Sequence, residues 1–196
     1  WSDNDLVKSE NFKKIGKLIK IQFAGNHGRV QGLEILLNEL QNIKSNNIIF
    51  NFYGDGAAKK KLISIKNELE LSNINFYPSF NRSNQQKFLS DCDIGLITLM
   101  PGFSGLGVPS KTYNLLAAGK PILYIGDKKS EIDNYINKWD IGWSFDWSEI
   151  KELISFLNNI HKLKSNVFEI KSQNCINLAK NVFSKNIILE KYKLNG

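Results

Sequence analysis

Cysteine and histidine are scarce in this sequence of 196 residues, which contains two of each. Cys92 and Cys175 lie far apart and lack the spacing of metal ligands, so we expect free thiols in a reducing compartment. His27 and His161 have no Cys, His, Asp or Glu partner at ligand spacing, so neither a metal site nor a metal cofactor is predicted. The sequence also shows no nucleophile elbow and no Ser/His/Asp order.

Long apolar runs are lacking as well, and none approaches the length of a membrane span. The length suits one large domain better than two small ones. The net charge of +7 favours anionic partners such as phosphates or an anionic membrane surface, or it reflects a composition rich in Lys, Asn and Ile. The lysine clusters are not interleaved with aromatic residues as a base-stacking surface would be, so nucleic acid is not the expected partner.

What the sequence does contain is a regular alternation of short apolar runs and longer amphipathic ones. The apolar runs predict strands at 18–25, 48–54, 74–79, 94–99, 121–126 and 141–145. The amphipathic runs predict helices at 30–40, 58–71, 84–92, within 105–121, at 131–139, at 147–160 and onward to the end of the chain. This order predicts an α/β fold, a doubly wound, Rossmann-like parallel sheet of about six strands with helices on both faces and extra C-terminal helices.

The loop after the first strand has the composition of a phosphate-binding turn. In such sheets, ligands bind outside the carboxyl ends of the strands. In GNHGRVQG (25–32), glycines permit close approach of the backbone, and the Arg29 guanidinium can bind two phosphate oxygens. The spacing differs from G-x-G-x-x-G, and no acidic residue ends the second strand, so a dinucleotide fingerprint is excluded. A tight strand-to-helix turn without any ligand stays open for this loop taken alone.

The segment GLGVPSKT (105–112) nearly matches a P-loop, but Ser110 replaces the second glycine, so a nucleoside triphosphatase is not expected. Pro109 suits the first position of a helix, Ser110 and Lys111 fall in its first turn, and Gly119 suits its end. A helix of this length at the ligand edge would present its N–H groups to a phosphate.

Other patterns are assigned to packing or excluded. A receiver-type phosphorylation domain needs acidic residues after its first strand, where this chain has 25–27, Gly-Asn-His. His27 is interpreted as a loop residue near the ligand rather than a general base. Trp139, Trp143 and Trp147 are interpreted as packing residues rather than as a platform for a sugar.

Together these loops resemble the C-terminal, nucleotide-sugar-binding half of family 4 glycosyltransferases of the GT-B architecture. The matching stretches follow in order from residue 18 to about residue 160: FAGNHGRVQGLEILLNEL, FYGDGAAKKKL, INFYPSFNRSNQQKFLSDCDIGLITL, VPSKTYNLLAAGKPILYI and SEIDNYINKWDIGWSF. The forms GNxGxxQG and PSK…AAGKP are most similar to bacterial members that build capsule, O-antigen or similar surface polysaccharides. Residues 1–17 would be the remnant of an interdomain linker, and 18–196 the donor-binding domain of an enzyme whose acceptor domain is absent from this chain.

The resemblance implies a site for a nucleotide-sugar, most often a UDP-sugar, which is a substrate rather than a cofactor. Arg29 and Lys111 would be the catalytic groups of this half, because they would stabilise the leaving diphosphate, and transfer would retain the configuration of the sugar. The base would lie beside 77–80. The implied nucleotide-binding residues are Gly25, Asn26, His27, Gly28, Arg29, Gly54, Asp55, Gly56, Tyr77, Pro78, Ser79, Phe80, Gly107, Val108, Pro109, Ser110, Lys111 and Asn114.

The sequence also departs from the family pattern. The usual pair of glutamates, E-x7-E, falls on Leu106 and Asn114, and a lysine that commonly follows the arginine falls on Gln31. Asn114 can still bind one ribose hydroxyl, and Lys111, one turn earlier, can replace the lost cation.

These departures leave alternatives open. The chain is either half of a cytoplasmic glycosyltransferase, inactive alone, or a catalytically degenerate homologue that serves as a binding or regulatory subunit. A non-hydrolysing epimerase would need more carboxylates and histidines at the cleft. The expected partners are a nucleotide-sugar, the N-terminal acceptor domain of the same protein, and a lipid-linked acceptor at the inner face of the cell membrane.

Overall fold

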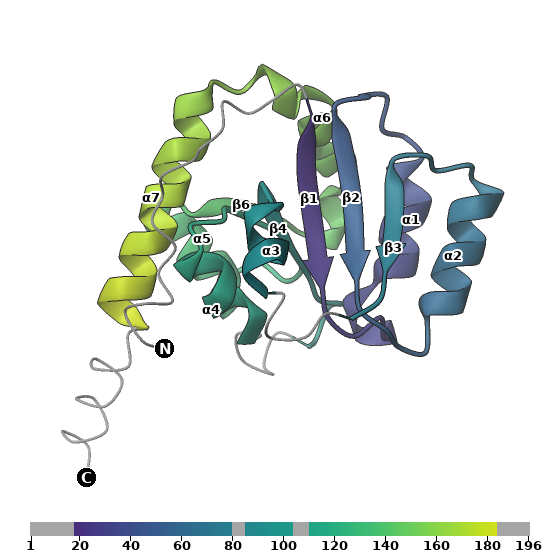
Figure 1. Ribbon diagram of the computed structural model, residues 1–196, viewed down its shortest axis with the longest axis horizontal. Helices are drawn as coiled ribbons and strands as arrows, with labels where there is room; N and C mark the ends of the chain where they lie inside the picture. Colours follow the sequence, from purple (N-terminus) through teal and green to yellow (C-terminus); the bar gives the residue numbers. More distant parts are fainter. Residues whose placement is uncertain (1–17, 80–84, 104–109, 184–196) are drawn as a thin grey trace, which may run out of the picture.

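The chain folds into a single sheet of parallel strands. The computed structural model describes residues 18–79, 85–103 and 110–183 (Figure 1). The strands are β1 (Ile19–Ala24), β2 (Ile48–Tyr53), β3 (Ile74–Tyr77), β4 (Ile94–Thr98), β5 (Ile122–Ile125) and β6 (Gly142–Phe145). They form a six-stranded sheet in the order β3-β2-β1-β4-β5-β6, and every pair is parallel. The predicted doubly wound, Rossmann-like architecture is confirmed.

Helices cover both faces of the sheet (Figure 1). One face carries α1 (Leu33–Leu40), α2 (Lys59–Glu68) and α6 (Ile150–Asn159). The other carries α3 (Gln85–Ser90), α4 (Ser110–Ala117), α5 (Glu131–Trp139) and α7 (Ser165–Val182). Short 3₁₀ turns precede α1 (Arg29–Gln31), precede α6 (Trp147–Glu149) and follow it (Ile160–Lys162). Each face therefore has its own hydrophobic core, which explains why the strands are apolar on both sides.

Local chemistry sets where the helices start and stop. Gly32, at a φ of 62°, separates the turn 29–31 from α1, so the helix predicted at 30–40 begins later than expected. The Asp146 side chain accepts from the Ser148 N–H and caps a 3₁₀ turn at Trp147–Glu149, so the helix predicted at 147–160 becomes α-helical only at Ile150. The C-terminal prediction is confirmed through α7, and its last part lies outside the described residues.

The end of α4 is fixed by Gly119, as the sequence predicts. Gly119 adopts a φ of 63°, its N–H donates to the Leu116 carbonyl at 3.0 Å, and the Lys120 N–H donates to the Leu115 carbonyl at 2.8 Å. These two bonds form a Schellman motif, which satisfies the last carbonyls of the helix. The position at which α4 ends is therefore set by Gly119.

The two cysteines and the three tryptophans in the second half of the chain belong to the cores. Cys92 and Cys175 are buried free thiols, and burial raises the pKa of Cys92 to about 12. The Trp143 ring packs against Phe156 with centroids 5.2 Å apart, Trp139 packs against the core of its face, and the Trp147 indole N–H donates to a backbone carbonyl. The packing role expected of the tryptophans is confirmed.

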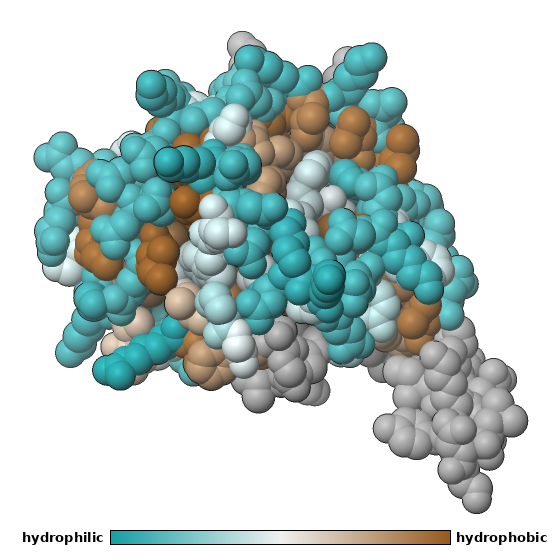
Figure 2. Space-filling model, turned by 180° about the vertical axis from the view of Figure 1, so that it is seen from behind, coloured by the Kyte–Doolittle hydropathy of each residue, from teal (hydrophilic) through white to brown (hydrophobic). Residues whose placement is uncertain are grey.

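The surface seen from behind carries apolar side chains in small groups separated by hydrophilic ones (Figure 2). Within the part of the chain that the structure describes, no helix combines the length and the apolar character needed to cross a bilayer. The same residues contain no group of three or more His, Cys, Asp or Glu that could hold a metal ion.

Candidate functional site

The centre of the sheet contains a topological switch point. The chain runs outward from β1 through β2 to β3, and then returns to pair β4 with the other side of β1 before it runs outward again through β5 and β6. The loops that follow β1 and β4 therefore leave in opposite directions and open a crevice at their carboxyl ends, which is where ligands of such sheets bind. The loop after β1 and the first turn of α4 line this crevice.

Backbone contacts fasten the loop after β1 to the loop after β2. The His27 N–H donates to the Asp55 carbonyl at 2.8 Å. A side chain at Gly54, whose φ is 139°, would overlap the carbonyl oxygen of Gly25, and one at Gly56 would overlap Asn26. These glycines are therefore required for two backbones to pack directly against each other.

The turn at Gly28 and Arg29 is closed by Gln31. The Gln31 carboxamide oxygen accepts from the Gly28 N–H at 3.2 Å, so the residue that replaces a lysine of the resembled family has a structural contact here. A side chain at Gly32 would lie 2.6 Å from the Met100 sulfur. The turn is thereby held against the segment that follows β4, while Arg29 itself is exposed.

Lys111 places an ammonium group at the crevice. Its Nζ lies 4.1 Å from the centroid of the Phe23 ring, and a side chain at Gly25 would lie 3.2 Å from the same nitrogen. Across the described ranges, no carboxylate forms an ion pair with Lys111. Burial lowers the pKa of this ammonium to about 8. A half-buried cation without a described carboxylate partner is suited to bind an anion.

His27 lies beneath the same loop. Its ring is fully buried, at 5.8 Å from the Phe23 ring and 5.9 Å from the Phe76 ring. Neither ring nitrogen forms a hydrogen bond with another described group. Desolvation, followed by the charge of Lys59, lowers the pKa of His27 and outweighs the nearby backbone of Tyr53, which raises it. The imidazole is therefore neutral near pH 7. This neutral ring supports the loop from below.

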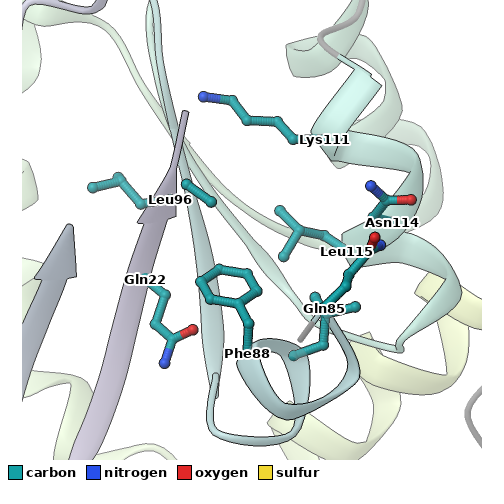
Figure 3. A pocket seen from close by; sticks show the side chains of 9 residues that line it. Gln22, Gln85, Phe88, Leu96, Lys111, Asn114 and Leu115 are labelled. Carbon is teal, nitrogen blue, oxygen red and sulfur yellow. The ribbon is translucent and has the colours of Figure 1, made fainter. Parts of the chain in front are cut away.

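Three hollows surround these groups. The largest, of about 460 Å³, is lined by Ala24, Gly25, Asn26, Tyr53, Gly54, Asp55, Ser79 and Lys111. A second, of about 410 Å³, is lined by Gly28, Arg29, Gly32, Leu33, Glu34, Ile35, Ala57, Ala58, Lys61 and Met100. A small pocket of about 70 Å³ is lined by Gln22, Ala24, Gln85, Phe88, Leu89, Leu96, Lys111, Asn114 and Leu115 (Figure 3). The largest hollow and the small pocket share Lys111, so they are neighbours.

The small pocket has a polar rim made of carboxamides. In Figure 3, Asn114 and Gln85 lie on one side of the pocket, Gln22 lies on the other, and Lys111 extends across the top. Gln22 is buried, its Nε2 donates to the Asp91 carbonyl at 3.1 Å, and its Oε1 has no partner among the residues described. This rim can bind neutral hydroxyl groups.

The structure brings some of the predicted site residues together and separates others. Gly25, Asn26, Gly54, Asp55, Ser79 and Lys111 share the largest hollow. Gly28 and Arg29 line the second hollow, so the two predicted catalytic cations occupy separate hollows. Tyr77 and Pro78 are exposed after β3, Gly56 supports Asn26, and Ser110 begins α4. Phe80, Gly107, Val108 and Pro109 lie outside the described residues, as does Leu106.

Sequence reasoning missed several residues of this site, namely Gln22, Phe23, Tyr53, Gln85 and Phe88. The Tyr53 ring stacks on Tyr77, with centroids 4.6 Å apart and planes inclined by 18°. Both tyrosines end a strand, and that position is the signal that could have placed Tyr53 at the ligand edge. Phe23 carries no such signal, because a phenylalanine in an apolar strand is expected to belong to the core.

Comparison with known proteins gives related sequences and a shared fold. The chain is 38% identical over 123 residues to WbjE of Pseudomonas aeruginosa, which is named as a glycosyltransferase, and the match covers 63% of this chain and 31% of that protein. It is 27% identical over 112 residues to WcaI of Escherichia coli K12, which is named as a glycosyl transferase of colanic acid biosynthesis. That match covers 57% of this chain and 28% of WcaI. The matches thus span about a third of each relative. No protein-family model matches the chain.

Among solved structures, Anabaena HepE in complex with UDP-glucose has a TM-score of 0.74 at 16% identity, over 100% of this chain and 53% of that one. Staphylococcus aureus TarM has a TM-score of 0.73 at 18% identity, over 97% of this chain and 38% of TarM. The C-terminal domain of the Francisella tularensis group 1 glycosyl transferase LpcC has a TM-score of 0.71 at 13% identity, over 93% and 97%. The chain therefore has the Rossmann-like fold found in glycosyltransferases of the GT-B architecture.

Proposed function

We propose that this chain is the donor-binding domain of a family 4 glycosyltransferase that moves a sugar from a nucleotide-sugar, most simply a UDP-sugar, to a polysaccharide or lipid-linked acceptor. The observation that carries the proposal is the Lys111 ammonium. It faces a hollow of about 460 Å³ at the switch point of the sheet, and no described carboxylate neutralises it. A diphosphate is the part of a nucleotide-sugar that this charge would bind.

The comparisons support the same assignment. WbjE and WcaI are named as glycosyltransferases, the HepE structure contains UDP-glucose and the TarM structure contains UDP. The LpcC domain, which this chain matches over 97% of its length, is the C-terminal domain of its enzyme. The colanic acid named for WcaI supports a role in bacterial surface polysaccharide synthesis, such as capsule or O-antigen.

The residues of this chain would act by binding and by charge. In the bound state, Lys111 would hold one diphosphate oxygen from the side of α4, and Arg29 would approach from the other side of the loop 25–28. As the sugar leaves, negative charge grows on the diphosphate, and fixed cations stabilise it without rearrangement. The acceptor would be bound, and the remaining catalytic groups supplied, by an N-terminal domain of the same protein. The sugar would be transferred with retention, at the cytoplasmic face of the membrane where a lipid-linked acceptor lies.

A second candidate is a degenerate homologue that binds without catalysis. It is favoured by the rim of the small pocket, where Asn114 contributes a carboxamide in place of a carboxylate. A carboxylate accepts from two neighbouring hydroxyls, whereas a carboxamide oxygen and its NH₂ group offer one acceptor and two donors. The ribose would therefore be held less strongly.

Calorimetric titration of UDP, GDP and their sugar conjugates into the chain tests the proposal. We expect UDP to bind weakly, and Lys111→Met to reduce its affinity by about tenfold, in line with the loss of one charge-assisted contact. Lys151→Met, which removes an exposed lysine of α6, is the matched control and should leave binding unchanged. Transfer by the intact two-domain protein separates the enzyme from the degenerate homologue. Absence of binding to every nucleotide would contradict both.

A further inference from the structure

Phe23 touches the charged end of Lys111, although it is a buried residue of the central strand. The Nζ of Lys111 lies 4.1 Å from the centroid of the Phe23 ring. The contact follows from the topology, because β1 pairs with β4, and α4 is the next helix after β4. A cation on the face of an aromatic ring is attracted by the ring quadrupole, more strongly where water is excluded.

The described titratable groups around the Lys111 ammonium do not neutralise its charge. Asp55 lines the same hollow, but its carboxylate accepts from the Gly56 N–H at 2.8 Å and forms no ion pair with Lys111. His27 is neutral near pH 7, and burial raises the pKa of Tyr53, so the phenol is neutral as well. Apart from Lys111 itself, the polar side chains of the small pocket, which come from β1, α3 and α4, are uncharged carboxamides.

We propose, resting on the function proposed above, that Phe23 is a positioning residue of the donor site, whose ring keeps the Lys111 ammonium charged and in place until a diphosphate oxygen pairs with it. The glycine at position 25 completes the arrangement, because a side chain there would lie 3.2 Å from Nζ and would enter the same space. Burial lowers the pKa of Lys111 to about 8. The attraction of the ring opposes that desolvation and favours the charged form that an anion requires.

The test begins without ligand. In protein with ¹³C-labelled lysine, the ¹³Cε shift of Lys111, assigned through Lys111→Met, reports its titration. We expect Phe23→Leu to lower the midpoint by about 0.5 pH units, the effect of losing one cation–π contact. Phe52→Leu is the matched control, because Phe52 is equally buried and lies 6.0 Å from Phe23 by ring centroids. Phe23→Met replaces Phe23→Leu if the latter does not fold. An unchanged or raised midpoint in the Phe23 variant, or an equal fall in Phe52→Leu, would overturn the proposal.

Titration of UDP then separates this inference from the proposed function. UDP should raise the Lys111 midpoint in the wild type. Phe23→Leu should bind UDP about 3-fold more weakly at pH 8.5 and equally well at pH 6.5, because the lower midpoint leaves fewer charged side chains at the higher pH. If UDP leaves the wild-type midpoint unchanged, the proposed function fails while the ring contact can still be confirmed. If UDP binds to the wild type, and Phe23→Leu binds it with the same affinity as the wild type at pH 8.5, the positioning role of Phe23 fails.

Discussion

The carbonyl oxygen of Gly25 occupies the space that a side chain at Gly54 would need. The two loops that carry these residues follow neighbouring strands, and the Gly25 N–H donates to the Tyr53 carbonyl at 3.0 Å. The hollow next to Lys111 is lined by both loops, so its shape depends on this backbone contact. The predictions below concern first this contact and then the side chains around it.

Gly54→Ala should destabilise the protein by about 3 kcal/mol, because it combines a left-handed backbone with overlap against a carbonyl group. Gly102→Ala is the control. Gly102 also has a positive φ, of 84°, but has open space around it. It should cost about 1 kcal/mol from backbone strain alone. Urea unfolding followed by circular dichroism measures the free energy of unfolding of both variants. Equal losses of stability would show that the overlap with the Gly25 carbonyl does not contribute.

Lys111→Met should make the chain more stable at pH 7, by about 1 kcal/mol, because it removes a half-buried, desolvated charge that has no described carboxylate partner. Burial lowers the pKa of Lys111 from 10.5 to about 8. The folded state therefore binds the proton less tightly than the unfolded state, and the wild type gains stability as pH rises from about 8 to 10.5. The advantage of Lys111→Met should shrink over that range. Chemical denaturation at pH 7, 8.5 and 10 measures it, and Lys151→Met should show no such trend.

His27→Met should stabilise the protein by about 1 kcal/mol at pH 7, because both ring nitrogens of His27 are buried without a described partner. The pKa of His27 is lowered in the folded state, so stability is fully present above the unfolded value of 6.5 and is lost as pH falls below it. The variant should therefore lose less stability than the wild type between pH 6.5 and 5. His161→Asn, at an exposed position, is the control, and an identical acid response of His27→Met and wild type would refute the expectation.

Asn114→Glu should increase the affinity for UDP by about 3- to 10-fold, because a carboxylate can accept from both ribose hydroxyls where the carboxamide cannot. The deoxyribose nucleotide dUDP lacks the 2′-hydroxyl and serves as the control ligand. Calorimetry should show a much smaller gain for dUDP, and an equal gain for both would mean that position 114 does not contact the ribose.

Much of the fold follows from local signals in the sequence. The helix predicted at 131–139 has the bounds of α5, because the Ser130 side chain accepts from the Asp133 N–H and caps it. The sequence also predicts the strand count, because each parallel strand is an apolar run covered on both faces. Helix starts near 30 and 147 were less predictable, since a 3₁₀ turn and the first turn of an α-helix have similar patterns.

The site was predictable only in part. Glycines and a basic residue after β1 indicate a ligand edge from sequence alone, and Lys111 at the start of a short helix indicates an anion. The contact between Phe23 and Lys111 depends instead on which strands are neighbours, because the two residues approach each other only when β1 pairs with β4. The same holds for the separation of Arg29 from Lys111 into two hollows.

The structure of the protein with bound UDP tests the central claim most directly. The account predicts that the diphosphate lies in the hollow between Gly25 and Lys111, with one of its oxygens within hydrogen-bonding distance of the Lys111 Nζ. A diphosphate bound elsewhere, with the Lys111 ammonium still resting on the Phe23 ring and touching no part of the nucleotide, would contradict it.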